Sequence, residues 1–184
     1  MRWTKNPVTG GEACFSDDAI YRYRLVRPFY VPKMDLFEPK PARDGRRCLF
    51  VMLNPSTADA FFEDPTIRRC MSFARSWGFD ILEVVNLFAL RSTDPHTLYE
   101  HADPIGPDND GQIAEAIARS DLVIAAWGAH GKIRERNKHV LAAICKTHDV
   151  HALKVSQKTK APYHPLYLAA DTKPAVFVAK GSAT

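Results

Sequence analysis

Short, mainly apolar segments recur through the chain from residue 48 onward, and they constrain its fold more than any other feature. Cys48–Leu53 and Leu122–Trp127 are unbroken apolar runs, whereas Ile81–Leu87 and Val150–Val155 each include two polar residues. Runs of this length without polar alternation are typical of parallel strands that are buried on both faces of a sheet. Apolar residues at helical spacing lie between them, so the sequence predicts repeated β-then-α units.

The helical segments carry start and stop signals. Asp64 can cap a helix that begins at Pro65, and Gly78 can end it. Further helices are expected over 110–120 and 133–146, and an edge strand over 174–179. The predicted fold class is α/β: a three-layer α/β/α domain with a central, mainly parallel sheet of four to five strands.

The N-terminal segment reads differently. Ala13–Phe15 and Ile20–Val26 are expected to form a β-hairpin, since Tyr21, Tyr23 and Leu25 alternate with other residues. Five breakers between residues 28 and 46 indicate an extended connection or flap. We therefore expect residues 1–46 to form a hairpin and Pro-rich connection, and 47–184 to form the α/β/α domain.

Composition excludes several classes of protein. The chain has 184 residues, of which 46% are apolar and 25% charged, which suits one globular domain and argues against disorder. No stretch approaches the roughly 20 apolar residues that span a bilayer, and the N-terminus lacks an apolar signal core, so a cytoplasmic protein without membrane contact is expected.

The cysteines and glycines argue against a metal or cofactor. The four cysteines lie too far apart in sequence for a Cys-x-x-Cys clip, so we expect reduced thiols, at least two of them buried. His148 and His151 lack a third ligand nearby. No Walker A sequence or dinucleotide fingerprint is present. We therefore predict no metal and no cofactor.

Polar residues follow the predicted strands directly. Because the carboxyl ends of parallel strands meet at one edge of a sheet, these residues are expected to converge there. The candidate catalytic residues are Asn54, Asp59 and His164. The candidate substrate-binding residues are Ser56, Thr57, Phe61, Phe62, Asn86, Arg91, Gly128 and His130.

Several segments resemble an uncharacterised family of short bacterial and phage proteins, domain-of-unknown-function family 1643. They are Phe15–Ser16 with Tyr21–Arg22–Tyr23, Leu53–Asp59, Asp64–Pro65–Thr66, Val85–Asn86–Leu87 and His164–Pro165–Leu166. The resemblance covers about residues 12–168. It implies no established activity.

The order of the strand-end motifs also resembles, more distantly, the uracil-DNA glycosylase superfamily. Leu53–Asn54–Pro55–Ser56 is similar to its G-I-N-P-G motif, and Val84–Val85–Asn86 to the strand whose Asn reads the base. Ala126–Trp127–Gly128 and His164–Pro165–Leu166 are similar to its later Leu-Gly and His-Pro-Ser motifs. Asn54 differs from the Asp of one branch, and Leu166 replaces the Ser. The resemblance implies a nucleic-acid-binding hydrolase.

The residue chemistry fits such a site, with structural alternatives open. Asn54 can hold a water or form an Asx turn with Pro55. Asp59 has no obvious structural role and is the better candidate base than Asp64. Asn86 can pair with a base edge, or it can bond neighbouring loop backbone. His164 can donate to a base carbonyl or a phosphate, and one of the two adjacent phenylalanines can stack on a base while the other packs beneath the loop.

The predicted function is therefore binding of a nucleotide or nucleic acid, DNA rather than RNA, with or without hydrolysis of an N-glycosidic bond. The alternatives are a non-catalytic nucleic-acid or nucleotide-binding module, and a hydrolase or transferase that acts on a free modified nucleotide. The net charge of +4 permits a polyanionic partner. A basic groove containing Lys154, Lys158 and Lys160 would favour DNA, whereas a pocket roofed by residues 28–46 would favour a small molecule.

Overall fold

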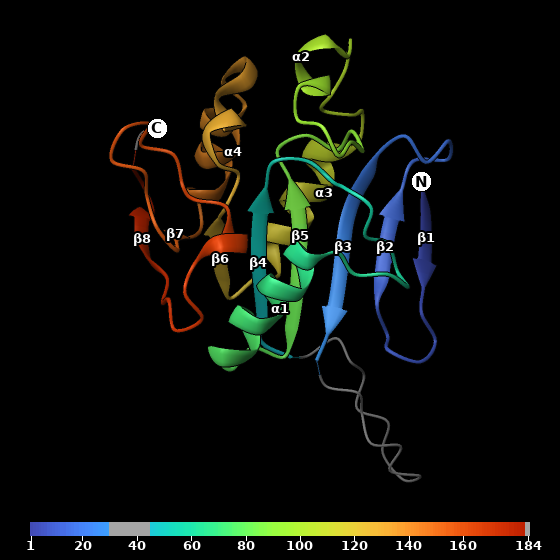
Figure 1. Ribbon diagram of the computed structural model, residues 1–184, viewed down its shortest axis with the longest axis horizontal. Helices are drawn as coiled ribbons and strands as arrows, with labels where there is room; N and C mark the ends of the chain where they lie inside the picture. Colours follow the sequence, from blue (N-terminus) through green and yellow to red (C-terminus); the bar gives the residue numbers. More distant parts are fainter. Residues whose placement is uncertain (30–44, 183–184) are drawn as a thin grey trace, which may run out of the picture.

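All strands in the described part of the chain belong to one mixed sheet, ordered β1-β2-β3-β5-β4-β6-β7-β8 (Figure 1). The computed structural model describes residues 1–29 and 45–182. The strands are β1 (Arg2–Lys5), β2 (Glu12–Phe15), β3 (Arg22–Pro28), β4 (Arg47–Met52), β5 (Ile81–Asn86), β6 (Leu122–Ala125), β7 (Val150–Ala152) and β8 (Ala175–Val178). The helices are α1 (Pro65–Ser76), α2 (Thr97–Glu100), α3 (Asn109–Ala118) and α4 (Arg136–Ile144), with 3₁₀ helices η1 (Ala129–Glu135) and η2 (Pro165–Tyr167).

The sheet corrects the prediction of a mainly parallel sheet of four to five strands. Strands β5, β4, β6 and β7 are parallel, but β1, β2 and β3 form an antiparallel meander that pairs with β5, and β8 is antiparallel to β7. The predicted hairpin is present as β2 and β3. Its alternating pattern indicates a strand but does not say which strand it pairs with, and for that reason the extension of the sheet through β3 was not foreseen.

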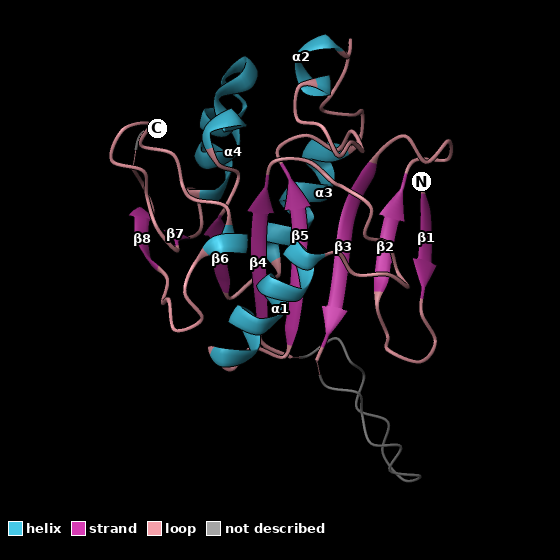
Figure 2. Cartoon of the chain, viewed as in Figure 1, coloured by secondary structure: helices cyan, strands magenta, loops and turns pink. Residues whose placement is uncertain are grey.

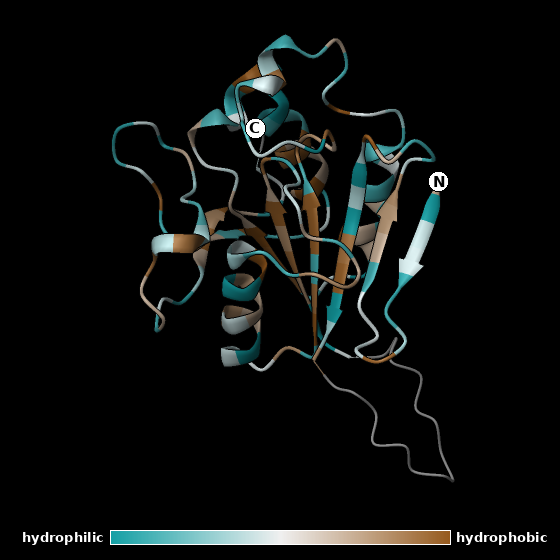
Figure 3. Ribbon diagram, turned by 45° about the vertical axis from the view of Figure 1, so that its right-hand side comes forward, coloured by the Kyte–Doolittle hydropathy of each residue, from teal (hydrophilic) through white to brown (hydrophobic). Residues whose placement is uncertain are grey.

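Helices cover both faces of the sheet (Figure 2). Alternate residues of β4 face opposite sides: Phe50 packs in the cluster that contains α1, and Val51 in the cluster that contains α3 and α4. We call these sides the α1 face and the α3/α4 face. The central strands are the most hydrophobic elements of the molecule, as their brown colour in Figure 3 shows. Burial of both faces accounts for the unbroken apolar runs.

Helix α1 begins as its sequence predicts. The Asp64 carboxylate accepts a hydrogen bond from the backbone nitrogen of Ile67 at 2.8 Å, and Pro65 occupies the first turn. Gly78 follows the helix with a φ of +76°, a conformation that glycine adopts without strain. Ile67, Cys70, Phe73 and Ala74 are buried against the sheet.

Helix α4 begins three residues later than predicted. Arg134 and Glu135 have positive φ values of 51° and 54°, so the helical pattern is interrupted between η1 and α4. The guanidinium of Arg134 donates to the carbonyls of His101 and Ala102, which fixes this kink against the segment after α2. Strand β1 and helix α2, each four residues long, were not predicted.

Two further observations complete the fold. All four cysteines are free and buried, so the expectation that at least two of them are buried is confirmed. Within residues 1–29 and 45–182, no helix is long and apolar enough to cross a membrane. The expected flap over 28–46 falls almost entirely outside the described residues.

Candidate functional site

A change in chain direction marks the candidate site at the carboxyl edge of the parallel strands. Strands β4 and β6 are neighbours, yet the chain leaves β4 toward α1 on one face and leaves β6 toward α4 on the other. In open α/β sheets, ligands bind in the crevice outside the carboxyl ends of such a pair of strands. The loops that begin at Leu53 and Ala126 border this position (Figure 1).

The amide of Asn54 holds two strand-end segments together. Its Nδ2 donates to the carbonyl of Ser92 at 2.8 Å and to that of Pro55 at 3.3 Å. The backbone nitrogen of Ser92 in turn donates to Pro55. Asn54 therefore has a structural role, but not the expected Asx turn, because its side chain donates through Nδ2 to two carbonyls. A carboxylate here would set an oxygen against the Ser92 carbonyl.

Asp59 also has a structural role, contrary to the expectation from sequence. Its Oδ1 accepts hydrogen bonds from the backbone nitrogens of Phe61 at 2.8 Å and Phe62 at 2.9 Å, so it closes a turn. The two phenylalanine side chains are 57% and 72% exposed. Neither packs beneath the loop, so that expectation was wrong, and both are open to solvent. On the same loop, Ser56 is half-buried and Thr57 is exposed.

Asn86 ends β5 on the α1 face. Val84 precedes it on that face, and the Asn86 side chain is only 2% exposed. Its carbonyl accepts from Asn109 Nδ2 at 3.1 Å, but its own Nδ2 has no partner among the described residues. Because a buried amide without a partner is costly, this nitrogen is a candidate ligand contact.

His164 is half-buried just before η2. Its Nδ1 accepts a hydrogen bond from the backbone nitrogen of Leu166 at 3.4 Å. In the neutral ring, Nε2 then carries the proton and is the atom that can donate. Burial lowers the pKa of His164, while the negative charge of Asp64 opposes that shift. His164 therefore presents a neutral donor on the same face as the start of α1.

Two arginines lie near the start of β3. Arg91 donates to the carbonyl of Ala19 at 3.1 Å and lies 5.2 Å over the Phe15 ring, so it braces the β2–β3 turn. Arg22 was not predicted as a site residue. It is 2% exposed, and its NH1 donates to the carbonyl of Ala58. Arg22 is one of three arginines in β3, and nothing in the local sequence distinguishes it from Arg24 and Arg27.

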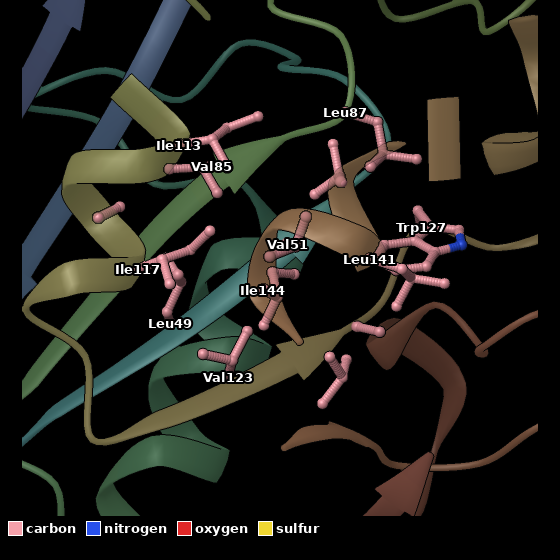
Figure 4. Close-up of a cluster of buried hydrophobic side chains, with 14 of the residues drawn as sticks. Leu49, Val51, Val85, Leu87, Ile113, Ile117, Val123, Trp127, Leu141 and Ile144 are labelled. Atoms are coloured by element: carbon pink, nitrogen blue, oxygen red, sulfur yellow. The ribbon is translucent and has the colours of Figure 1, made fainter. Parts of the chain in front are cut away.

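A basic pocket of about 290 Å³ opens beside Gly128 on the α3/α4 side of the sheet. Lys132, Lys158 and Lys160 line it together with Trp127, and no Asp or Glu of residues 1–29 and 45–182 does so. Figure 4 shows the Trp127 indole at the border of the buried cluster, with its nitrogen directed away from the other labelled side chains. A pocket lined by three lysines is suited to an anion.

Gly128 shapes the edge of this pocket. Its φ is +69°, and its nitrogen donates to the carbonyl of Pro162 at 3.0 Å, which ties the loop after β6 to the lysine-containing loop. His130 lies beyond this point. Its Nδ1 is 3.2 Å from the Tyr99 hydroxyl, and its ring is 6.0 Å from that of His96, so it connects η1 to α2.

The structure thus divides the predicted residues into groups. On the α1 face, the negative charge of Asp64 acts on both His164 and the unpredicted Arg22, where it opposes the lowering of the pKa by burial. Gly128 borders the lysine pocket near the other face. Asn86, also on the α1 face, keeps an unpartnered buried nitrogen among the described residues. Most of the other predicted residues bond loop backbone, contact α2 or project into solvent. In residues 1–29 and 45–182, no three His, Cys, Asp or Glu side chains are grouped as metal ligands are.

Comparison with known proteins gives one match. The model of a family described as "Protein of unknown function (DUF1643)" matches residues 22–166, which is well over half of the chain. No curated protein and no solved structure matches. The resemblance to the uracil-DNA glycosylase superfamily is therefore without support from these comparisons.

Proposed function

The chain belongs to the DUF1643 family, and from its site we propose that it binds a phosphate-bearing nucleotide or a nucleic acid. The observation that carries this proposal is the pocket lined by Lys132, Lys158 and Lys160, to which the described part of the chain contributes no carboxylate. A phosphate satisfies several ammonium groups at once, and binding offsets their mutual repulsion. The position of the pocket, at a strand end where α/β proteins bind ligands, supports the same reading.

The shape of the basic region bears on the size of the ligand. Lys158 and Lys160 line the pocket, but Lys154 does not and lies 5.1 Å over the Tyr163 ring. The continuous groove that would favour DNA thus lacks one of its three lysines. A pocket of about 290 Å³ is at the small end of ligand sites, which favours one phosphate group with its sugar as the bound unit.

A binding titration tests this proposal. A nucleoside 5′-monophosphate, the matching nucleoside and a single-stranded oligodeoxynucleotide are compared by calorimetry. We expect the phosphorylated ligands to bind and the nucleoside to bind at least about tenfold more weakly, because hydrogen bonds to charged groups contribute roughly 1.5–3 kcal/mol. Binding of the oligonucleotide should also weaken steeply with salt.

Matched lysine variants locate the binding. The double variant Lys158→Ala, Lys160→Ala should lose most of the affinity for the monophosphate. The double variant Lys146→Ala, Lys173→Ala changes net charge equally at exposed positions outside the pocket and should keep it. Equal affinity for nucleoside and nucleotide, or equal losses in the two double variants, would remove the pocket from the function.

A second candidate is hydrolysis of an N-glycosidic bond, and His164 is the residue that favours it. A neutral imidazole with Nε2–H can donate to a base carbonyl as negative charge develops on the leaving base. If this reaction occurs, His164→Ala should slow release of free base from oligonucleotides by about 100-fold or more. An unchanged rate in this variant would exclude the role, and binding without any release would leave the non-catalytic module.

A further inference from the structure

Five arginines are buried among the residues that the structure describes, and one of them differs from the rest. Arg22 has no carboxylate oxygen within 4.0 Å among the described residues. The other four each pair with one. These pairs are Arg24 with Glu83 and Glu115, Arg47 with Glu83, Arg27 with Glu63, and Arg136 with Asp110.

The partners of Arg22 leave its charge poorly compensated. NH1 donates to the Ala58 carbonyl, which is neutral, and the buried Nε has no partner in the part of the chain that is described. Taking an ion out of water costs several kcal/mol unless it is paired and fully hydrogen-bonded. The Nε of such a guanidinium can still donate a hydrogen bond to an acceptor that bears negative charge.

A second unsatisfied donor lies on the same face. Leu25 of β3 pairs directly with Val84 of β5, and both side chains belong to the α1 face. Asn86 is the next residue of β5 on that face. On β3, an irregularity between Cys14 and Phe15 in the pairing with β2 brings Arg22 onto the α1 face beside Phe15. Asn86 Nδ2 and Arg22 Nε are therefore two unpartnered donors on adjacent strands.

We propose that Arg22 and Asn86 form a binding site for an oxyanion of a ligand, a carboxylate or a phosphate. The group binds at the carboxyl edge of β5, under the loop that carries Ala58. Its oxygens accept from Arg22 Nε and Asn86 Nδ2, and they compete with the Ala58 carbonyl for NH1, since charge-assisted hydrogen bonds are stronger than neutral ones.

Arg27 is a buried arginine in similar surroundings that does have a counterion. It is buried on the same face, and its NH2 donates to the Asp59 carbonyl of the same loop. Its Nε, however, lies 3.3 Å from a Glu63 oxygen. Arg27 thus anchors the loop with its charge paired, so loop anchoring alone does not require an unpaired guanidinium at Arg22.

The site is distinct from the lysine pocket. Trp127 of that pocket packs in the α3/α4 cluster, whereas Ala58, above Arg22, packs in the α1 cluster. This inference therefore does not rest on the proposed function. The Lys158→Ala, Lys160→Ala variant separates the two, because it should leave the oxyanion site intact.

Side-chain NMR tests the site directly. Inorganic phosphate and acetate are titrated separately into ¹⁵N-labelled protein, and the Arg22 Nε–H and Asn86 Nδ2–H₂ signals are followed. We expect both signals to move together in a saturable manner with at least one of the two anions, and the anion that binds more tightly identifies the chemical class. Saturation with neither anion overturns the proposal.

Variants at the two arginines provide the matched control. Arg22→Gln should weaken anion binding, read from the Asn86 signal, by about tenfold or more. Arg27→Gln removes another buried arginine of β3 that donates to the same loop, and this variant should keep the binding. Asn86→Asp provides a second test that keeps Arg22. The new carboxylate supplies the missing counterion, so the thermal stabilisation of the protein by the anion should disappear. Persistence of that stabilisation in Asn86→Asp, or equal loss in the two arginine variants, overturns the site.

Discussion

Gly131 packs directly against the indole of Trp127. A Cβ placed on Gly131 would lie 2.1 Å from Cδ1 and 2.7 Å from Nε1 of that ring, so any larger residue forces the indole or η1 to move. The same indole lines the lysine pocket on one side and contacts the buried α3/α4 cluster on the other (Figure 4). The absence of a side chain at residue 131 therefore fixes one wall of the pocket.

Gly131→Ala should destabilise the protein and weaken ligand binding in the lysine pocket together. Overpacking of this kind costs about 1–3 kcal/mol, measured as the free energy of unfolding in urea. Gly111→Ala is the control, since a Cβ there has no atom within 4 Å and the residue lies in α3. The control should be neutral or up to about 1 kcal/mol more stable. Similar losses in both variants would contradict the packing argument.

Glu83→Gln should be among the most damaging single substitutions in the sheet. Glu83 is fully buried, and its two oxygens accept from Arg24 Nε at 2.7 Å and Arg47 NH1 at 2.8 Å. The substitution removes the only charge shared by these two guanidinium groups and turns an amide donor toward one of them. Loss of one partner of a buried ion pair costs about 3–5 kcal/mol in unfolding free energy.

Glu115 serves as the comparison for this prediction. It lies 3.2 Å from Arg24 NH1 but is 58% exposed, so solvent screens the pair. Glu115→Gln should change the free energy of unfolding by less than about 1 kcal/mol. Comparable effects of the two glutamate variants would show that burial does not govern this network.

The native protein should be inert to thiol reagents. All four cysteines are buried, and desolvation raises the pKa of Cys70 and, well above its ordinary value, that of Cys48. Because the thiolate is the reactive form, we expect no labelling by an aromatic disulfide reagent under native conditions and labelling of four thiols in denaturant. Rapid native reaction of one equivalent would locate a thiol that solvent reaches.

The central elements were predictable because their signals are local. An unbroken apolar run requires burial on both faces, and the Asp64–Pro65 pair defines the start of α1 by a single hydrogen bond and a fixed φ. The meander of β1, β2 and β3 was foreseen only as a hairpin, since its attachment to β5 depends on residues about 60 positions apart in sequence, such as Leu25 and Val84.

The site was less predictable, because the same residue types serve structure and function. Asn54 and Asp59 have suitable chemistry, but backbone groups of the strand-end loops occupy their side chains. Arg22 reads as one of several arginines in an alternating strand. What distinguishes it is the absence of a nearby carboxylate, and this is a property of the packed protein rather than of the local sequence.

Stability should depend on pH through His164. Burial lowers the pKa of this imidazole below its ordinary value of 6.5, so the unfolded chain takes up a proton at a higher pH than the folded protein does. Where the unfolded state binds more protons, stability rises with pH. The contribution of His164 is therefore complete above about pH 6.5 and is lost as the pH falls through the lower, folded-state pKa.

His164→Asn isolates this effect, because Asn Oδ1 can replace Nδ1 as the acceptor for the Leu166 nitrogen while removing the titratable ring. Urea unfolding at about pH 7.5 and about pH 5.5 should show a smaller acid-induced loss of stability in the variant than in the parent. His139→Asn, at a histidine whose side chain is 65% exposed, should keep the parent's loss. If His164→Asn retains the full pH dependence, the imidazole does not resist protonation in the folded state, and its role as a neutral donor to a ligand fails with it.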